Sequence, residues 1–286
     1  MTNLNIIFFG TGPLAESVLF ALHQNGYTPK LVVTKPDALV GRHQTLTPPS
    51  IKKWCELKGI AVYQPEKLKD LDNTSPLLQD YDLAIVASYG KIIPQNILNT
   101  PKHGFLNVHP SELPLYRGPS PIESQLRDGL KEIGLSIMKL DTEMDHGPIL
   151  AQNKIHVENN DTSATLEIKS GQIGGRMLVD CIEHYVNGSL IPKDQDHSRA
   201  TVCKFIEKSE GEISLTDDIE TIKNKWRAYT PWPGIFFFHT HSGKTLRIKI
   251  NKLNPNANTL DQMIESVTPE GKSEIGWEDF KRGYFN

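Results

Sequence analysis

The fold of this chain can be worked out from an apolar run near its middle, Gly104-Phe105-Leu106-Asn107-Val108-His109-Pro110. A short, mostly apolar run of this kind indicates a buried strand, and Pro110 ends it because proline cannot donate to a strand ladder. Side chains two residues apart on a strand share one face, so we expect Asn107 and His109 to lie side by side where the strand ends. In an open α/β sheet, this edge usually carries the ligand site.

The first half of the chain alternates apolar runs with amphipathic segments, which is typical of a doubly wound, mostly parallel α/β sheet. Strands are expected at residues 5–9, 31–34, 61–63, 82–87, 104–109, 134–140 and 149–157. Helices are expected at residues 13–24, 48–57, 120–127 and 163–185, with a polar loop between residues 35 and 47. The run at 82–87 is almost entirely apolar, as a strand buried on both faces requires.

A smaller second unit follows a polar segment that has no periodicity. We place a large α/β domain at residues 1–190, a linker at 191–206 and a small β domain at 207–286. Thr216 is expected to cap a helix that runs to Trp226, because a threonine hydroxyl can accept from the first free amides of a helix. Strands at 235–239 and 245–250 flank His241-Ser242-Gly243, which favours a hairpin.

The composition is that of a soluble globular protein. The 286 residues are 38% hydrophobic and 23% charged, with a formal net charge of −3. No apolar run approaches the roughly 18 residues of a membrane span, and Gly10-Thr11-Gly12 follows the first apolar run too early for a secretory signal. We therefore expect a cytoplasmic, monomeric protein without a membrane partner. Three widely spaced cysteines, at positions 55, 181 and 203, argue against a disulfide framework or a zinc site.

Three polar residues suit acyl transfer, namely Asn107, His109 and the distant Asp145. A histidine can take a proton near neutral pH, a neutral amide can donate to an oxyanion, and a carboxylate can orient the imidazole. For these three residues alone, the alternative that they only satisfy loop backbone is at least equally open.

The residues around this set form a long motif, N-V-H-P-S-E-L-P-L-Y-R-G at 107–118 and L-D-T-E-M-D-H-G-P-I-L at 140–150. This motif resembles the signature of the N10-formyltetrahydrofolate-dependent formyltransferases. The resemblance implies a Rossmann-like catalytic domain, N10-formyltetrahydrofolate as formyl donor, no metal, and Asn107, His109 and Asp145 as the catalytic residues. His146 departs from the usual threonine, and a second imidazole beside Asp145 would perturb its charge.

The same resemblance implies two folate-contacting segments. The turn Ser111-Glu112-Leu113-Pro114 matches the family's folate-contacting turn, although Glu112 replaces the usual aliphatic residue. The loop with Tyr89, Gly90 and Ile92 resembles the family's pterin-facing loop. Its backbone would bind the edge of the pterin while apolar walls hold the ring. From spacing alone, a simple strand-to-helix turn is the alternative.

The second unit narrows the resemblance to the methionyl-tRNA formyltransferases. Residues 228–234, A-Y-T-P-W-P-G, resemble the aromatic-Pro-Trp-Pro-Gly turn of that group, and residues 268–284 resemble its C-terminal end. The resemblance implies initiator methionyl-tRNA as the acceptor and an OB-like barrel as the small domain. Since only residues 253–266 separate these two landmarks, we expect the barrel to be trimmed.

Two basic segments are expected to bind this tRNA. Residues 35–48 resemble the loop that enters the acceptor end, where Lys35 and Arg42 would contact phosphates or an unpaired base. Residues 221–260 contain no acid and interleave basic with aromatic residues, and from them we assign Lys244, Arg247 and Lys249 to the RNA backbone. Ordinary solvated surface is the alternative for both segments.

Other functions compete with this hypothesis. Gly10-Thr11-Gly12-Pro13-Leu14-Ala15 fits a dinucleotide-binding fingerprint, but the expected acid after the second strand is missing, so we expect close packing rather than bound NAD. The same three catalytic residues would serve a formyltransferase acting on a small amine, such as a nucleotide-linked amino sugar, or a folate hydrolase. An inactive tRNA-binding relative is the last alternative.

Overall fold

The computed structural model describes residues 4–40, 44–68 and 75–285, and the chain divides into two compact units. The first unit comprises Met1–Pro119, Gly134–Ile155 and Glu167–Val202. The second comprises Ser120–Ile133, His156–Leu166 and Cys203–Asn286. None of the described helices is long and apolar enough to cross a membrane.

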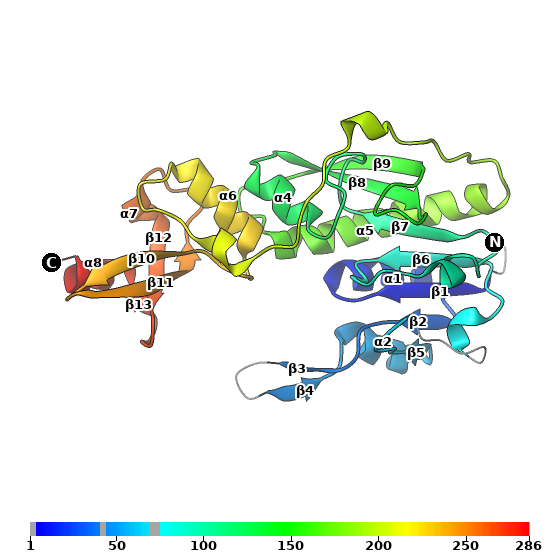
Figure 1. The fold of residues 1–286 in the computed structure, drawn as a ribbon, viewed down its shortest axis with the longest axis horizontal. Coiled ribbons are helices and arrows are strands. Elements are labelled where there is room, and N and C mark those ends of the chain that lie inside the picture. Colours follow the sequence, from blue (N-terminus) through cyan, green and yellow to red (C-terminus); the bar gives the residue numbers. More distant parts are fainter. Residues whose placement is uncertain (1–3, 41–43, 69–74, 286) are drawn as a thin grey trace. The chain divides into compact units, whose positions relative to one another are not determined.

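The first unit is built on a seven-stranded sheet (Figure 1). Its order is β5 (Ala61–Tyr63), β2 (Leu31–Val33), β1 (Ile6–Gly10), β6 (Leu83–Ala87), β7 (Phe105–His109), β8 (Glu132–Lys139) and β9 (Ile149–His156). The first five of these run parallel, whereas β8 is antiparallel to β7. The predicted doubly wound, mostly parallel α/β sheet is therefore confirmed.

The helices of this unit are α1 (Pro13–Gln24), α2 (Ser50–Lys58), α3 (Gln95–Leu98) and most of α5 (Ser163–Val186). Glycines let α5 approach its neighbours closely. A Cβ at Gly171 would lie 2.5 Å from the Leu14 carbonyl oxygen on α1, and one at Gly174 would lie 2.5 Å from a Val108 methyl on β7. Val108 therefore faces α5, and the alternate residues of β7 face the other side of the sheet.

That other side carries an aromatic core. The Phe9 ring lies 5.4 Å from the ring centroids of both Tyr89 and Phe105, and all three side chains are buried. Burying an apolar side chain of this size stabilises the fold by about 1.5–3 kcal/mol. Phe105 thus anchors β7 two residues before Asn107.

The glycine motif after β1 serves the close packing expected of it. A Cβ at Gly10 would lie 2.6 Å from Phe8, 2.7 Å from Ala15 and 2.8 Å from the Ala87 carbonyl oxygen. Gly12, at the N-cap of α1, has φ 90, a backbone conformation that side chains with a Cβ rarely adopt. The two glycines are explained by packing and by backbone conformation.

The second unit combines two packed helices with an antiparallel sheet. Helix α4 (Pro121–Arg127) packs on α6 (Ile219–Tyr229). The sheet has the order β10 (Phe236–His241), β11 (Lys244–Leu253), β12 (Ile264–Pro269) and β13 (Ile275–Gly276), with α7 (Leu260–Met263) before β12. Helix α8 (Trp277–Tyr284) packs on it through ring contacts of Phe237 with Trp277 and Phe280. The expected small C-terminal β unit is confirmed as this four-stranded sheet.

Two local predictions differ from the structure. The segment expected to be a loop contains a two-stranded ribbon, β3 (Ala38–Val40) and β4 (Thr45–Thr47). The expected cap of α6 at Thr216 is wrong, because Asp218 accepts from the Thr221 amide at 3.0 Å. The Thr216 hydroxyl instead lies 2.6 Å from the Ser214 hydroxyl in the preceding turn.

Candidate active site

Strand β7 brings Asn107 and His109 to the same face of the sheet, at its carboxyl end. They are 8% and 5% exposed, so most water is already excluded from both side chains. Their shared orientation follows from the two-residue period of a strand, with Val108 between them on the opposite face. The predicted juxtaposition of the two residues at the end of this strand is what the structure contains.

Asp145 joins them from the loop between β8 and β9. Its Oδ1 lies 3.7 Å from Nδ1 of His109 and accepts from Nδ2 of Asn107 at 3.5 Å. Its Oδ2 accepts from the Gly118 amide at 2.8 Å. Asp145 has φ 50, in the left-handed region that aspartate tolerates better than most residues. The structure thus brings the three sequence-predicted catalytic residues into one cluster.

The second nitrogen of His109 has its own partner. Nε2 lies 3.0 Å from the carbonyl oxygen of Tyr116, which can only accept a hydrogen bond. The Nε2 atom therefore carries a proton, and Nδ1, facing Asp145, is the nitrogen that can take up another. A proton gained at Nδ1 would be stabilised by the nearby carboxylate.

The turn Ser111-Glu112-Leu113-Pro114 is clamped to β8 and β9. The Ser136 hydroxyl donates to the Ser111 carbonyl oxygen at 2.6 Å, and the Leu113 amide donates back to that hydroxyl at 3.2 Å. Gln152 donates to the Leu113 carbonyl oxygen at 2.9 Å. These bonds fix the backbone of the segment expected to contact folate.

The two departures from the family pattern have their own partners. The Glu112 carboxylate pairs with Lys154 at 3.2 Å, with both side chains about half exposed. The His146 ring donates from Nδ1 to Asp141 at 2.7 Å and stacks on His197 with centroids 4.0 Å apart and planes 3° apart. The imidazole beside Asp145 in sequence is therefore engaged with other residues.

The expected pterin-facing loop divides into a buried and an exposed part. The Tyr89 side chain lies in the core, and its burial raises the pKa of the phenol to about 12. Gly90 has φ 71 and lies next to the Lys35 side chain, because a Cβ placed on Gly90 would be 3.4 Å from Nζ of Lys35. Ile92 is 93% exposed. This arrangement leaves backbone groups and Ile92, rather than the Tyr89 ring, available to a ligand.

Of the two residues expected to meet tRNA in the first unit, only Lys35 is described, and it lies at the same edge of the sheet as the candidate site. Lys35 lies two residues after the end of β2 and is exposed. Arg42 lies outside the described residues. Hydrogen bonds from Gln64 and Lys52 hold the pKa of Asp37 below its usual value and fix the start of the β3–β4 ribbon. The ribbon exposes three large apolar side chains, those of Leu39, Val40 and Leu46.

The basic residues assigned in the second unit are divided between the two faces of the β10–β11 hairpin. Lys249 lies opposite Phe236 and Arg247 opposite Phe238, so these four residues share one face. The Arg247 guanidinium lies 3.8 Å from the centre of the Phe236 ring, and Lys249 is exposed. Lys244 pairs with His241 at the hairpin end and has the opposite orientation. One face of the sheet therefore carries the exposed ammonium group of Lys249, the guanidinium of Arg247 stacked on Phe236, and the exposed ring of Phe238.

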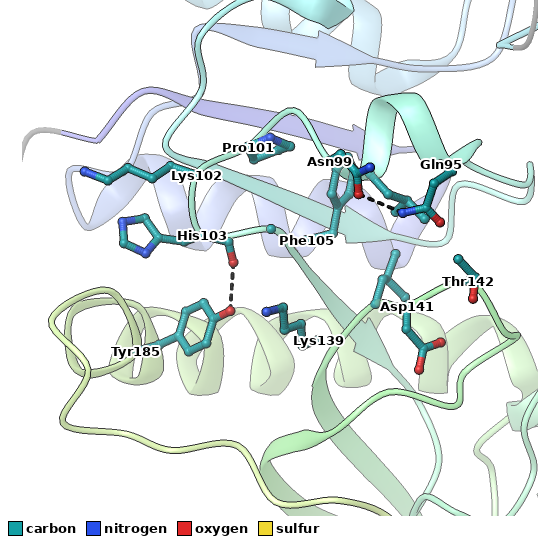
Figure 2. A pocket seen from close by; sticks show the side chains of 13 residues that line it. Gln95, Asn99, Pro101, Lys102, His103, Phe105, Lys139, Asp141, Thr142 and Tyr185 are labelled. Atoms are coloured by element: carbon teal, nitrogen blue, oxygen red, sulfur yellow. Dashed lines mark hydrogen bonds between the residues drawn. The ribbon is translucent and has the colours of Figure 1, made fainter.

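A cavity of about 520 Å³ lies near the start of β7 and includes the first residues of the Asp145 loop (Figure 2). The Tyr185 hydroxyl donates to the His103 carbonyl oxygen at its margin. Asp141 lines this cavity, whereas Asn107, His109 and Asp145 do not. Within the described part of the chain, no group of three or more histidine, cysteine, aspartate or glutamate residues is arranged to hold a metal ion.

Two residues of this site, Gln195 and Arg117, were not predicted from the sequence as functional residues. Gln195, in the segment expected to be a linker, donates to the carbonyl oxygens of Asp145 and Gly147 at 2.9 and 2.7 Å. Arg117 donates to the Gln195 side chain at 3.2 Å from Nε and 2.7 Å from a terminal nitrogen. Both residues are more than nine-tenths buried. Nothing in their local sequence signals these contacts, which join residues about 50 and 80 positions apart.

Comparison with known families shows that this is a formyl-transferring protein. A model described as formyl transferase matches residues 4–182, and one described as formyl transferase, C-terminal domain, matches residues 205–263. The chain therefore belongs to the formyl transferase family, as its motif indicated.

Its sequence relatives are more specific. The methionyl-tRNA formyltransferase of Caldicellulosiruptor saccharolyticus is 38% identical over 274 residues, which cover 94% of this chain and 87% of the relative. The resemblance to methionyl-tRNA formyltransferases seen in the sequence is confirmed by this match.

Solved structures share the fold at low identity. A methionyl-tRNA formyltransferase from Clostridium thermocellum has a TM-score of 0.60 at 18% identity, covering 96% of this chain and 99% of that one. An N-formyltransferase from Helicobacter canadensis, solved with folinic acid and dTDP-3-aminofucose, has a TM-score of 0.63 at 16% identity, covering 96% and 98%. At such identities the likeness extends to the fold alone.

Proposed function

We propose that the protein transfers the formyl group of N10-formyltetrahydrofolate to the α-amino group of methionine carried by initiator tRNA. The observation that carries this proposal is the convergence of Asn107, His109 and Asp145 at the end of β7, in a chain that matches methionyl-tRNA formyltransferases along most of its length.

Each residue has a role that its geometry supports. The amine nitrogen attacks the formyl carbon, and Nδ1 of His109 takes the proton that the amine loses. The Asn107 amide donates to the oxygen on which negative charge develops. Asp145 holds the imidazolium in place until its proton passes to N10, the nitrogen whose bond to the formyl carbon breaks.

The loops around this cluster suit a flat, partly apolar donor. Ile92 is 93% exposed on one loop and Met144 is 56% exposed beside Asp145 on another. Apolar side chains of this kind gain free energy when a ring covers them. The clamped turn from Ser111 to Pro114 offers fixed backbone groups next to His109. We therefore assign folate contacts to this turn and to the loop of Gly90 and Ile92.

The acceptor is assigned from the two basic segments and from the sequence relatives. Lys35 lies beside the folate loop, and we assign an RNA end to it and, from the sequence alone, to Arg42. Arg247 and Lys249 share a face with Phe238, which suits a sugar–phosphate backbone. A nucleotide-linked amino sugar is the second candidate acceptor, since the Helicobacter canadensis protein was solved with dTDP-3-aminofucose. We place the reaction in the cytoplasm.

Single-turnover formylation tests this proposal. The protein is mixed with N10-formyltetrahydrofolate and, in parallel, with methionyl initiator tRNA, uncharged tRNA, free methionine or dTDP-3-aminofucose. Formylation confined to the charged tRNA is the expected result. Formylation of the amino sugar would replace the acceptor, hydrolysis of the donor without acceptor would make the protein a folate hydrolase, and no turnover with bound tRNA would make it an inactive relative.

A further inference from the structure

The segment from Lys193 to Val202 is fastened to both loops that flank His109. At its start, Lys193 and Ile149 exchange two backbone hydrogen bonds of 2.8 Å at the end of the Asp145 loop. Near its end, the Thr201 hydroxyl accepts from the Tyr116 amide at 2.9 Å, and the Thr201 carbonyl oxygen accepts from the Arg117 amide at 2.9 Å. This segment, here called the strap, is therefore hydrogen-bonded to both loops of the candidate site and is not a free linker.

Gln195 lies two residues after the start of this strap and is 6% exposed. Its two amide hydrogens are directed at the carbonyl oxygens of Asp145 and Gly147, and its oxygen accepts twice from Arg117. A carbonyl oxygen can only accept and a guanidinium can only donate. The orientation of the Gln195 amide is therefore fixed by its partners, and no other side-chain chemistry of this length satisfies both sets.

The backbone that Gln195 holds is the one that needs support. Asp145 has φ 50, and a non-glycine residue keeps such a conformation only where its surroundings impose it. Gly118 fixes the Asp145 carboxylate from one side, and Gln195 fixes its backbone carbonyl from the other. With both ends of the residue held, Oδ1 stays directed at His109.

We propose that Gln195 is a positioning residue that, together with Arg117, aligns Asp145 with the imidazole of His109. The proposal rests on the proposed function for what Asp145 does, whereas the alignment itself is a property of the fold. Gln195 acts through Asp145 and touches no reacting atom.

A second contact of Arg117, through His197, supports the Asp145 loop as well. Arg117 donates to Nδ1 of His197 at 2.8 Å, and the His197 ring stacks on His146, the residue after Asp145. Because a guanidinium only donates, this bond requires Nδ1 of His197 to be unprotonated. Arg117 thus reaches the Asp145 loop by two routes, through Gln195 and through the stacked imidazoles.

Two substitutions of Gln195 separate positioning from packing. Gln195→Glu keeps the length and the contact with Arg117 but directs a carboxylate oxygen at two carbonyl oxygens, whereas Gln195→Ala leaves those carbonyls free to bind water. We expect kcat to fall on the order of 10- to 100-fold, with KM for both substrates within about twofold. We also expect Gln195→Glu to be the slower variant. A residue that only fills space would give the opposite order, since glutamate preserves volume and alanine does not.

Gln262→Glu is the matched control, because Gln262 is exposed on α7 and the substitution adds the same charge. Arg117→Lys is the second variant if Gln195→Glu does not fold, since lysine keeps the charge but cannot make the two-point contact with Gln195 that Nε and a terminal nitrogen of Arg117 make together. A kcat of Gln195→Glu equal to that of the control, or above that of Gln195→Ala, overturns the proposal.

Hydrogen exchange separates failure of this proposal from failure of the proposed function. Amides of residues 140–148 are expected to exchange faster in Gln195→Glu than in the unsubstituted protein, whichever acceptor the enzyme uses. Unchanged exchange in this peptide overturns the positioning role, and it does so even if the protein formylates no tRNA.

Discussion

The charge of Asp145 is expected to contribute a large part of the catalytic rate, and Asp145→Asn tests this directly. The asparagine side chain introduced at this position would keep the shape of the aspartate and would still accept from the Gly118 amide. Its amide nitrogen would then face Asn107 and Nδ1 of His109, where the carboxylate oxygen lies now. The substitution therefore removes one negative charge at almost constant volume.

The size of the effect follows from the separation of 3.7 Å between Asp145 and His109. Two unit charges at that distance attract by about 4.5 kcal/mol at an effective dielectric constant of 20 and by about 1 kcal/mol in bulk water. The side chains are 6% and 13% exposed, which favours the upper part of this range. Since about 1.36 kcal/mol corresponds to a tenfold change in rate, these energies correspond to a fall in kcat of about 5-fold to 2000-fold, and we expect the larger effects in this range.

Single-turnover formylation at saturating donor and acceptor measures this loss. KM for the folate should change little, because the charge acts on the imidazolium that forms during the reaction. Asp180→Asn, on an exposed part of α5, is the control for the loss of one carboxylate. A kcat within about threefold of this control would refute the assignment of His109 as a base supported by Asp145.

Three further outcomes are expected. Asn107→Ala should lower kcat about 100- to 1000-fold with nearly unchanged folate affinity, as loss of one oxyanion donor does; a loss confined to KM would assign Asn107 to donor binding. Lys249→Gln should weaken tRNA binding and reduce its dependence on salt by about one counterion, as fluorescence titration at several salt concentrations would show; an unchanged slope would remove Lys249 from the interface. Hydrogen bonds from Lys281 and then Trp277 lower the pKa of Asp261, so the stability it adds is present above its unfolded-state pKa and is lost as the pH falls through the lower folded-state value. The melting temperature of Asp261→Asn should therefore be lower than that of the unsubstituted protein at neutral pH, and the two melting temperatures should converge in acid. A difference in melting temperature that stays constant with pH would contradict this.

The sequence alone predicts the arrangement of Asn107 and His109, the part of the site that lies on strand β7. The apolar run into Asn107 and His109 predicts a buried strand, and its period of two fixes which side chains share a face. The structure has the two residues in that arrangement, with Val108 directed at α5. A regular element carries its geometry in its sequence, so this part needed no knowledge of the tertiary structure.

The other half of the site depends on irregular backbone. Asp145 reaches His109 from a loop 36 residues further along the chain, with φ 50, and no spacing rule predicts that approach. The residue types indicated that a carboxylate could orient His109, and the resemblance to a known family implied that role for Asp145. Gln195 was hidden more completely, because its contacts run from a side chain to distant carbonyl oxygens and leave no local pattern.

Competition between similar residues explains the incorrect helix cap. Thr216 and Asp218 both have side chains that can cap a helix, and both precede the apolar positions of α6. The Ser214 hydroxyl accepts from the Thr216 amide and lies within 2.6 Å of the Thr216 hydroxyl, which holds that residue in the preceding turn. The cap then falls to Asp218, whose carboxylate accepts from the Thr221 amide. Capping propensity predicted the region in which α6 begins, and the hydrogen bonds between Ser214 and Thr216 determine that Asp218 is the cap.

The two ring nitrogens of His109 face groups whose loops are both hydrogen-bonded to the same strap. Nε2 donates to the Tyr116 carbonyl oxygen, and the amide of Tyr116 is bound by Thr201. Nδ1 faces Asp145, whose carbonyl oxygen is bound by Gln195. A catalytic group works only if it is held within about 0.5 Å of its productive position. Since one continuous segment fixes both sides of the imidazole, a displacement of that segment would move the two partners of His109 together, and the alignment of the base depends on residues that contact no substrate.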